Sequence, residues 1–484
     1  MTPTTQQEHI LDLVENSREN LMIEAGPGTG KTRTLRLIDE AIAARYEVLY
    51  LAFNKRIVQE AMEPDDDGSP KFNETTEIRT INGAGYRAWR ETAAGRLTVD
   101  TKKTLNIFRA IIVTLSKEQQ DEAWIDYQLI KDSVGRAKAY GYIPDNTEAR
   151  PLYPRLIEPD VFFDSLEEKP SRLAQALIDD ILRQSIKLSY AGSIDFDDQL
   201  YMPVLFGGSF QAYPLVLIDE AQDLSPINHA MLERFIEKGS RLIAVGDPWQ
   251  SIYAFRGAVQ EGMNQIKDKF DCTVADLSVS FRCPSEIVKR AQWRNPKLTW
   301  SREGGEVLAL NSLHIDDIPD DATIICRNNA PLFSLALRLL AGKRGVMVTG
   351  TDIGVKIINI MNKLGPDTMK QEKVLDAIEA WRMEKLSVQS TTANDTADCM
   401  RVFACFGKTL SEATGYAEFL FKQRGAITLT TGHKAKGLEW DEVYHMDPFL
   451  IRVDKEEQEK NLSYVVTTRS ADKLYEIESK DIVS

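Results

Sequence analysis

The chain has 484 residues, of which 43% are hydrophobic, so it is long enough for two to four domains with substantial cores. Its net charge of −14 argues against a general polyanion binder, although a local groove on an acidic protein can still be basic. The apolar runs are too short to span a membrane, and the N-terminus does not resemble a signal peptide. The five cysteines include no C-x-x-C pair, which disfavours a zinc site and a disulfide framework. Together these features favour a reducing cytoplasm.

The first expected element is a helix that is preceded by the residues Thr4-Thr5-Gln6-Gln7. Two glutamines, Gln6 and Gln7, thus stand at a helix start. A glutamine amide donates and accepts hydrogen bonds together, which matches the edge of adenine. We therefore expect Gln6 to contact a nucleotide base; the alternative is a solvated first turn.

A glycine-rich segment, residues 25–32 (AGPGTGKT), follows the apolar run 21–23 and precedes a helical pattern over 32–44. Strand, glycine-rich turn and helix form the context that a phosphate-binding loop requires. Backbone N–H groups would surround phosphates, Lys31 would reach the β- and γ-phosphates, and the Thr32 hydroxyl would hold Mg²⁺. The alternative is a glycine turn that opens an ordinary helix. The residues expected at the nucleotide are Gly26, Gly28, Thr29, Gly30, Lys31, Thr32 and Arg33.

Next in the chain, residues 47–53 predict a second strand that ends in a polar, basic tip at 54–56, where ligands of parallel sheets bind. Residues 91–189 then read as a helical domain inserted into the first α/β unit. Its most basic part includes Lys131, Arg136 and Lys138, for which a solvated helix face is expected.

Carboxylates follow at two places. The acidic run 194–198 either helps to frame the site or consists of surface carboxylates. Residues 215–218 (LVLI) predict a buried strand with Asp219 and Glu220 at its end. Beside a phosphate loop, Asp219 would bind Mg²⁺ and Glu220 would polarise the attacking water.

A further strand over 241–246 leads to Gln250, which would sense the γ-phosphate. Tyr253 and Phe255 offer faces for base stacking, although core packing explains Tyr253 equally well. Phe281 and Arg282 close this unit with a ring and a permanent cation, which suit adenine and phosphate.

A second α/β unit follows, with a helical insert over about 367–421. Its expected strands are 306–310, 323–326, 346–348, 427–430 and 443–445. Residues 430–440 form a polar, glycine-bearing loop. Arg469 ends an apolar helix, either as an arginine finger or as a partner of the helix dipole.

Together these segments resemble superfamily 1 helicases of the UvrD/Rep type, including their phage-encoded relatives. The segments that carry the resemblance occur in the family's order: AGPGTGKT, LIDEAQDLSP, VGDPWQSIYAFRGA, VSFRCPSEIV, TGHKAKGLEW and LSYVVTTRS. The family's phosphate loop also starts with Ala-Gly, which accounts for Ala25 in a place where the strict pattern has glycine.

The resemblance implies that Gln6 reads adenine, that Phe281 stacks on it, and that Glu439, in the segment with Gly437, binds the ribose. Lys31 and Thr32 would handle the phosphates and the metal. The catalytic set would be Lys31, Asp219, Glu220, Gln250, Arg282 and Arg469.

The DNA-binding set that the resemblance implies is Phe53, Asn54, Asn82, Tyr253, Phe255 and His433. Phe255 would stack on a base where many relatives have tryptophan. Asn82 stands where relatives often have histidine, and the second insert is roughly half or less of the family's usual size.

The expected fold is two RecA-like parallel-sheet α/β domains with ATP in the cleft between them. The first domain covers 1–90 and 191–283, with a helical insert at 91–190. The second covers 284–366 and 422–484, with a small insert at 367–421. The expected activity is ATP- and Mg²⁺-dependent movement 3′ to 5′ on single-stranded DNA, with unwinding at duplex junctions.

Two other readings remain. In one, the protein is a translocase subunit of a repair, recombination or defence complex that unwinds only with a protein partner; the short second insert motivates it. In the other, the protein is a nucleotide-dependent switch without nucleic acid, which only the acidic charge supports.

Overall fold

The computed structural model describes residues 2–42, 45–65, 68–93, 95–166, 168–253, 261–387 and 393–483. The chain forms two compact units. The first contains Met1–Ala25 and Gly30–Leu277, and the second contains Gly26–Thr29 and Ser278–Ser484. The short loop Gly26–Thr29 joins the second unit because it makes hydrogen bonds to the segment that follows Leu277.

The first unit is built on a six-stranded sheet in the order β3-β2-β6-β7-β1-β8, and every pair in it is parallel. Parallel order brings the carboxyl ends of all six strands to one edge. The strands are β1 (Leu21–Ala25), β2 (Val48–Ala52), β3 (Thr76–Thr80), β6 (Leu215–Ile218), β7 (Arg241–Gly246) and β8 (Thr273–Leu277).

Helices cover both faces of this sheet, as the nearly continuous apolar strands require. Successive residues of β1 point into different cores: Ile23 packs with Ile10 of α1 and Leu35 of α2, while Met22 belongs to the core on the opposite face. The covering helices are α1 (Thr5–Asn16), α2 (Lys31–Ile42), α3 (Lys55–Met62), α4 (Ile81–Arg90), α10 (Asp198–Phe206), α11 (Pro226–Ile236) and α12 (Gly262–Lys269).

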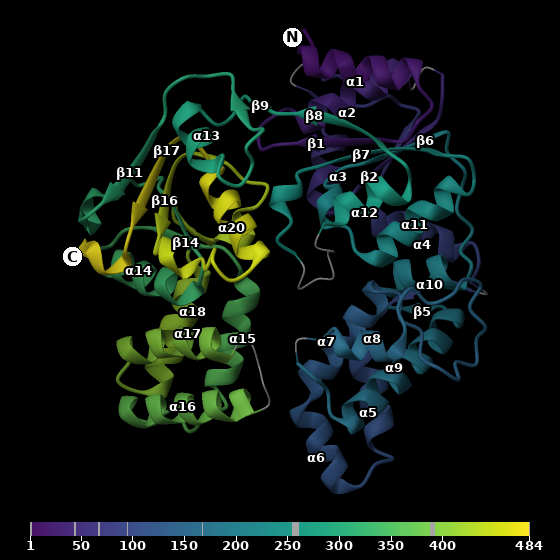
Figure 1. Ribbon diagram of the computed structural model, residues 1–484. Helices are drawn as coiled ribbons and strands as arrows, with labels where there is room; N and C mark the ends of the chain where they lie inside the picture. Colours follow the sequence, from purple (N-terminus) through teal and green to yellow (C-terminus); the bar gives the residue numbers. More distant parts are fainter. Residues whose placement is uncertain are drawn as a thin grey trace. The chain divides into compact units, whose positions relative to one another are not determined.

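A helical extension with its own apolar core interrupts the first unit and gathers at the end away from α1 (Figure 1). Phe108, Ile130 and Ile178 lie in that core. A short parallel pairing of β4 (Thr98–Val99) with β5 (Ser193–Ile194) closes its base. Its helices are α5 (Lys103–Ile112), α6 (Lys117–Ile125), α7 (Tyr127–Ala139), α8 (Pro159–Asp164) and α9 (Arg172–Tyr190).

A buried ionic cluster joins this extension to the start of α10. The Lys103 ammonium lies 2.6 Å from Asp198, and the Lys138 ammonium lies 2.8 Å from Asp198 and 2.5 Å from Asp195. Lys103, Lys138 and Asp198 are almost completely buried. Burial alone would raise the pKa of Asp198, but the two lysine charges outweigh it and lower that pKa.

This cluster corrects two expectations. Lys138 does not lie on a solvated helix face, and Asp198 is neither a surface carboxylate nor a free group that frames the nucleotide site. The Lys138 ammonium and the Asp198 carboxylate form a buried ion pair inside the extension. The sequence could not show this, because the partners lie 60 residues apart in the chain and a charge run alone indicates solvation.

The second unit contains another six-stranded, all-parallel sheet in the order β11-β17-β16-β13-β15-β14. Helices α13 (Ser285–Ala291), α14 (Asn329–Ala341) and α20 (Glu457–Thr467) pack against this sheet. The strands are β11 (Glu306–Leu310), β13 (Thr323–Cys326), β14 (Val346–Val348), β15 (Ile427–Thr431), β16 (Trp440–Met446) and β17 (Ser470–Ile477).

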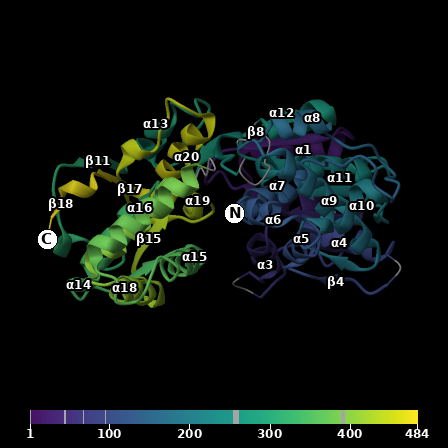
Figure 2. The same cartoon turned by 90° about the horizontal axis from the view of Figure 1, so that it is seen from below.

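A second group of helices lies at one end of this unit: α15 (Thr351–Met361), α16 (Gln371–Ser387), α17 (Ala393–Phe406) and α18 (Leu410–Lys422). Helix α16 is the outermost of them in Figure 1 and lies nearest the viewer in Figure 2, which looks from below. Phe403 of α17 packs on Phe333 of α14, so this group shares a core with the sheet.

The predicted α/β class, with two RecA-like parallel sheets that each carry a helical insertion, is confirmed. All five strands expected in the second unit are present, but the sequence analysis missed β17, which lies between β11 and β16. Charged residues interrupt this strand, and several of its positions are only partly buried. No helix in the described part of the chain is long and apolar enough to cross a membrane.

Candidate functional site

The glycine-rich loop follows β1 and ends where α2 begins at Lys31. Gly28 and Gly30 have φ angles of +68° and +83°, which side chains other than glycine rarely adopt. A Cβ at Gly28 would lie 2.4 Å from the Cβ of Arg282, so only glycine fits there. The loop therefore keeps its backbone open toward a ligand, as a phosphate cradle requires.

The N-terminus of α2 offers the groups that bind an anion. Lys31 and Thr32 stand in its first turn, and the Thr32 side chain is exposed. The Lys31 ammonium donates a 3.3 Å hydrogen bond to the carbonyl of Ala25, so it folds back toward the loop. Unsatisfied N–H groups at a helix N-terminus add positive potential at this point.

Gln7 contacts the phosphate-loop helix more closely than the sequence analysis anticipated. Its side chain is buried and donates a 3.0 Å hydrogen bond to the hydroxyl of Thr34, which itself donates to the carbonyl of Gly30. Gln6, expected at adenine, is half-buried on the same helix. The capping box of Thr4 and Gln7 in the sequence is the signal that identifies Gln7 as structurally engaged.

Three strand ends bring acidic and basic groups together, because β6, β7 and β1 are neighbours in the sheet. Lys31 follows β1, Asp219 follows β6 and Asp247 follows β7. Burial raises the pKa of both aspartates, and the positive charge of Lys31 opposes that rise. For Asp219, burial and the adjacent Glu220 raise the pKa to about 6.

Glu220 is held in an unusual backbone conformation at the end of β6. Its φ angle of +56° is left-handed, which is uncommon for glutamate and typical of functional sites. The side-chain amide of Gln222 donates to the Glu220 carboxylate, and its oxygen accepts from the N–H of Asp247 at 3.0 Å. Gln222 thus links two strand ends, a role that sequence reasoning missed.

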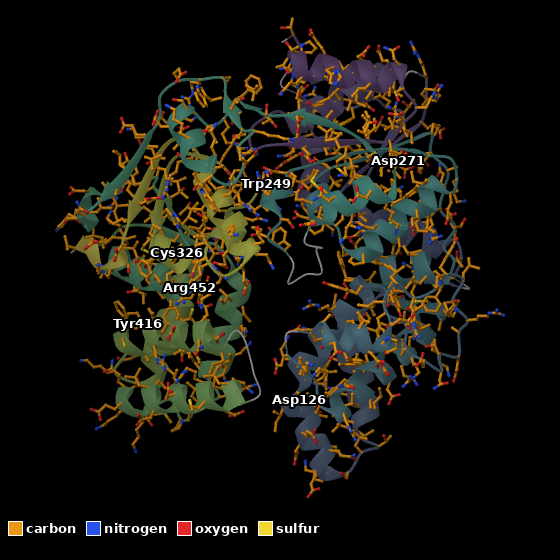
Figure 3. All side chains as sticks on the ribbon, in the orientation of Figure 1. Asp126, Trp249, Asp271, Cys326, Tyr416 and Arg452 are labelled. Carbon is orange, nitrogen blue, oxygen red and sulfur yellow. The ribbon has the colours of Figure 1, made fainter. Side chains whose placement is uncertain are left out.

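Gln250 lies in a short 3₁₀ turn, η2 (Pro248–Gln250), directly after β7. Its amide donates a 2.8 Å hydrogen bond to Asp247, and the N–H of Trp249 donates to the other oxygen of Asp247 at 3.0 Å. Figure 3 labels Trp249. Asp247 therefore fixes the turn that presents Gln250. The sequence analysis noted Gln250 but assigned no role to Asp247.

The residues present suit Mg²⁺ bound together with phosphates. No group of three or more His, Cys, Asp or Glu that could hold a metal alone occurs within the described ranges. Magnesium in nucleotide sites needs only one or two protein oxygens, because phosphates and waters complete its shell. The exposed Thr32 hydroxyl and the strand-end carboxylate of Asp219 provide that donor set.

In the second unit, Arg282 lies against the phosphate loop and forms an ion pair with Glu439. Phe281 is 52% exposed, and its N–H donates a 2.9 Å hydrogen bond to the carbonyl of Gly28. Gly437, two residues before Glu439, has a φ of +79°. The loop Gly26–Thr29, Phe281, Arg282 and Glu439 thus meet at one place.

Arg469, just after α20, is almost completely buried. Its guanidinium donates to the carbonyls of Val465 at 2.9 Å and Leu438 at 3.0 Å, and to the hydroxyl of Thr468 at 3.2 Å. These contacts hold it beside the segment that carries Gly437 and Glu439, and they satisfy the helix end as a dipole partner would.

The residues expected to bind DNA have varied settings. The rings of Phe53 and Tyr253 stack with centroids 6.4 Å apart, and the Asn54 oxygen caps α3 by accepting the N–H of Ile57. Asn82 donates a 3.0 Å hydrogen bond to the carbonyl of Phe196, whose side chain is 56% exposed and was missed by sequence reasoning.

Two further members of that set need separate mention. Burial lowers the pKa of His433 to about 4, so this side chain is neutral at physiological pH. Phe255 lies outside the described residues.

The comparisons with known proteins agree with this geometry. Relatives include F-box DNA helicase protein 1 of Schizosaccharomyces pombe, 22% identical over 97% of this chain and 57% of its own. The ATP-dependent DNA helicase PcrA of Staphylococcus aureus is 24% identical over 60% of this chain and 40% of its own. The RecBCD enzyme subunit RecB of Mycolicibacterium smegmatis is 24% identical over 49% and 26%. The chain thus spans roughly half or less of the length of these relatives.

Family models identify both parts of the chain. The model of the UvrD/REP helicase N-terminal domain matches residues 4–271, more than half of the sequence. The model of the UvrD-like helicase C-terminal domain matches residues 426–475. The chain belongs to the UvrD/REP helicase family.

Proposed function

We propose that this protein is an ATP-dependent DNA helicase or translocase that moves 3′ to 5′ on single-stranded DNA. The observation that carries the proposal is the meeting of Lys31, Asp219 and Glu220 at one edge of the first sheet, in a chain of the UvrD/REP helicase family. The name of its relative PcrA, an ATP-dependent DNA helicase, supports the same activity.

At the nucleotide, Lys31 pairs with the β- and γ-phosphates, and Thr32 and Asp219 hold Mg²⁺. The metal, when bound, neutralises charge on the phosphates. Glu220 accepts a proton from the attacking water, and the amide of Gln222 keeps its carboxylate in place. Gln250, fixed by Asp247, passes the state of the γ-phosphate on to the DNA-binding segments.

Arg282 and Arg469 stabilise negative charge on the γ-phosphate. The contact of Arg282 with the phosphate loop supports this role of Arg282. The ion pair with Glu439 keeps the Arg282 side chain in position. Gln6 and Phe281 hold adenine, and Glu439 binds the ribose. We also propose that the chain has two motor domains, each interrupted by one helical insert. The first domain covers residues 1–90 and 191–283 around the insert 91–190. The second covers residues 284–366 and 422–484 around the insert 367–421.

DNA binding is proposed for Phe53, Asn54, Asn82, Tyr253, Phe255 and His433. Exposed Phe196, positioned by Asn82, adds a further face for base stacking. Alternating grip on one strand, coupled to ATP binding and release, moves the protein along that strand.

The first test is steady-state ATP hydrolysis with and without single-stranded DNA. We expect a large stimulation by DNA, because hydrolysis is coupled to movement along the strand. Strand displacement should then succeed on 3′-tailed duplexes and fail on 5′-tailed ones. Hydrolysis that is indifferent to DNA would favour a nucleotide switch, and displacement from 5′-tailed duplexes alone would overturn the polarity.

Phe255→Ala should leave basal ATP hydrolysis unchanged and weaken single-strand affinity. Loss of one base-stacking ring costs about 1–3 kcal/mol, roughly a 5- to 150-fold rise in Kd. Tyr46→Ala is the control, because this aromatic residue precedes β2 and so lies at the amino-terminal edge of the sheet, away from the strand-end carboxylates. Fluorescence anisotropy with labelled oligonucleotides measures both variants; equal affinities would place the Phe255 ring in the core.

A second candidate is a translocase subunit that unwinds only with a partner. The similarity to the RecB subunit of an enzyme with several subunits favours this reading, as does the small second insert. DNA-stimulated hydrolysis without displacement of any tailed duplex by the purified protein would support it. Unaided displacement would exclude it.

A further inference from the structure

Tyr50, in the middle of β2, places a hydroxyl beside the proposed metal ligand. Its side chain is fully buried, and its ring packs on Phe72 with centroids 4.9 Å apart. Strand β2 pairs with β6 in a register that sets Tyr50 opposite Leu217, two residues before Asp219. The Tyr50 hydroxyl donates a 2.8 Å hydrogen bond to Oδ2 of Asp219.

Asp219 is held on both oxygens. Oδ1 accepts the N–H of Glu220 at 2.9 Å while Oδ2 accepts the Tyr50 hydroxyl, and the Asp219 N–H donates to the carbonyl of Leu51 at 3.0 Å. Each carboxylate oxygen has two lone pairs, so one donor on each oxygen leaves a lone pair for a cation. The carboxylate plane is therefore set before any ligand arrives.

We propose that Tyr50 is a positioning residue that orients the Asp219 carboxylate for Mg²⁺. The inference rests on the proposed function, which places Mg²⁺ and a nucleotide at this edge. Hydrogen bonds from outer residues orient the ligands of metal sites, and their loss commonly costs about 10- to 100-fold in metal affinity. Neither the residue pattern nor the family motifs of the sequence singled out Tyr50.

The alternative is that Asp219 merely satisfies a buried phenol. A buried tyrosine hydroxyl needs an acceptor, but a backbone carbonyl is sufficient. Tyr201, another fully buried tyrosine of the first unit, donates to the carbonyl of Tyr142 at 2.7 Å. Tyr201→Phe is thus a matched control, since it also removes a buried tyrosine hydroxyl, but one that donates to a backbone carbonyl and not to a strand-end carboxylate.

The experiment titrates Mg²⁺ into the full chain with a fluorescent methylanthraniloyl-ATP and follows nucleotide binding. For Tyr50→Phe we expect the half-saturating Mg²⁺ concentration to rise about 10- to 100-fold, with nucleotide affinity in EDTA unchanged. Tyr201→Phe should keep the wild-type Mg²⁺ midpoint. An unchanged midpoint for Tyr50→Phe, or an equal rise in both variants, would overturn the proposal.

The wild-type titration separates this inference from the proposed function. If the wild type binds the nucleotide without any dependence on Mg²⁺, or does not bind it, the proposed function fails. If the wild type responds to Mg²⁺ and Tyr50→Phe responds identically, only the inference fails.

A double-mutant cycle guards against a folding defect. Asp219→Asn removes the ligand charge, so adding Tyr50→Phe to it should not move the Mg²⁺ midpoint further, because contacting residues that act as one unit are non-additive. An additional shift in the double variant would mean that Tyr50 acts independently of Asp219.

Melting temperatures of Tyr50→Phe and Tyr201→Phe should fall by similar amounts, since each loses one buried hydrogen bond.

Discussion

Lys31→Ala is expected to abolish measurable ATP hydrolysis. Lys31 starts α2, folds back toward the loop through Ala25, and acts electrostatically on both Asp219 and Asp247. It is the cation that faces the phosphates in the proposed mechanism. Removing one preorganised charge-stabilising group costs about 10²- to 10³-fold in kcat. A coupled phosphate assay with saturating single-stranded DNA measures the effect.

Lys117→Ala provides the matched control. Its side chain is 81% exposed and pairs with a neighbouring surface carboxylate, Asp121, on the helical extension. This variant should hydrolyse ATP at the wild-type rate, because a surface ion pair contributes little. Substantial ATP turnover by Lys31→Ala would contradict the assignment of the nucleotide site to the phosphate loop.

Asp198→Ala is expected to produce the largest loss of stability. It removes the carboxylate that pairs with buried Lys103 and leaves buried Lys138 with Asp195 as its ion-pair partner. Breaking a buried ion pair by removing one partner costs about 3–5 kcal/mol of unfolding free energy. Hydrogen exchange should accelerate in α5, α7 and α9, whose side chains or carbonyls meet the cluster.

The control is Asp164→Ala, which removes an exposed carboxylate paired with Lys169 on the same extension. Its unfolding free energy should change by less than about 1 kcal/mol. Equal denaturation midpoints for Asp198→Ala and Asp164→Ala would contradict a stabilising role for the cluster.

The pH dependence of this effect follows from the lowered pKa of Asp198. A carboxyl with a lower pKa in the folded than in the unfolded protein stabilises the fold above the unfolded value, about 4. That contribution disappears as the pH falls below about 4 toward the folded pKa. The difference in stability between wild type and Asp198→Ala should therefore shrink on acidification.

Local patterns predicted the elements to which we assign the nucleotide chemistry. The glycine-rich turn between an apolar strand and a helix lies where expected, and Asp219 and Glu220 do follow a completely buried strand. These features are encoded by neighbouring residues: glycines for positive φ angles, apolar runs for buried strands. Parallel order then brings the strand ends together.

The partners of those residues could not be predicted, because they come from distant strands. Tyr50 reaches Asp219 only because β2 neighbours β6, and Gln222 reaches Asp247 only because β6 neighbours β7. A tyrosine within an apolar strand has the pattern of ordinary core. The same limit applies to Lys138, whose burial depends on Asp198.

The position of β17 has a consequence for synthesis on the ribosome. Among the described strands, β11 pairs only with β17, and β17 also borders β16. Residues 306–310 therefore have no sheet to join until residues 470–477 have left the exit tunnel. Pairing of such distant segments is slow and leaves apolar surface exposed in the meantime. The first sheet, complete by residue 277, can assemble during translation, whereas the second sheet must wait for its last strand.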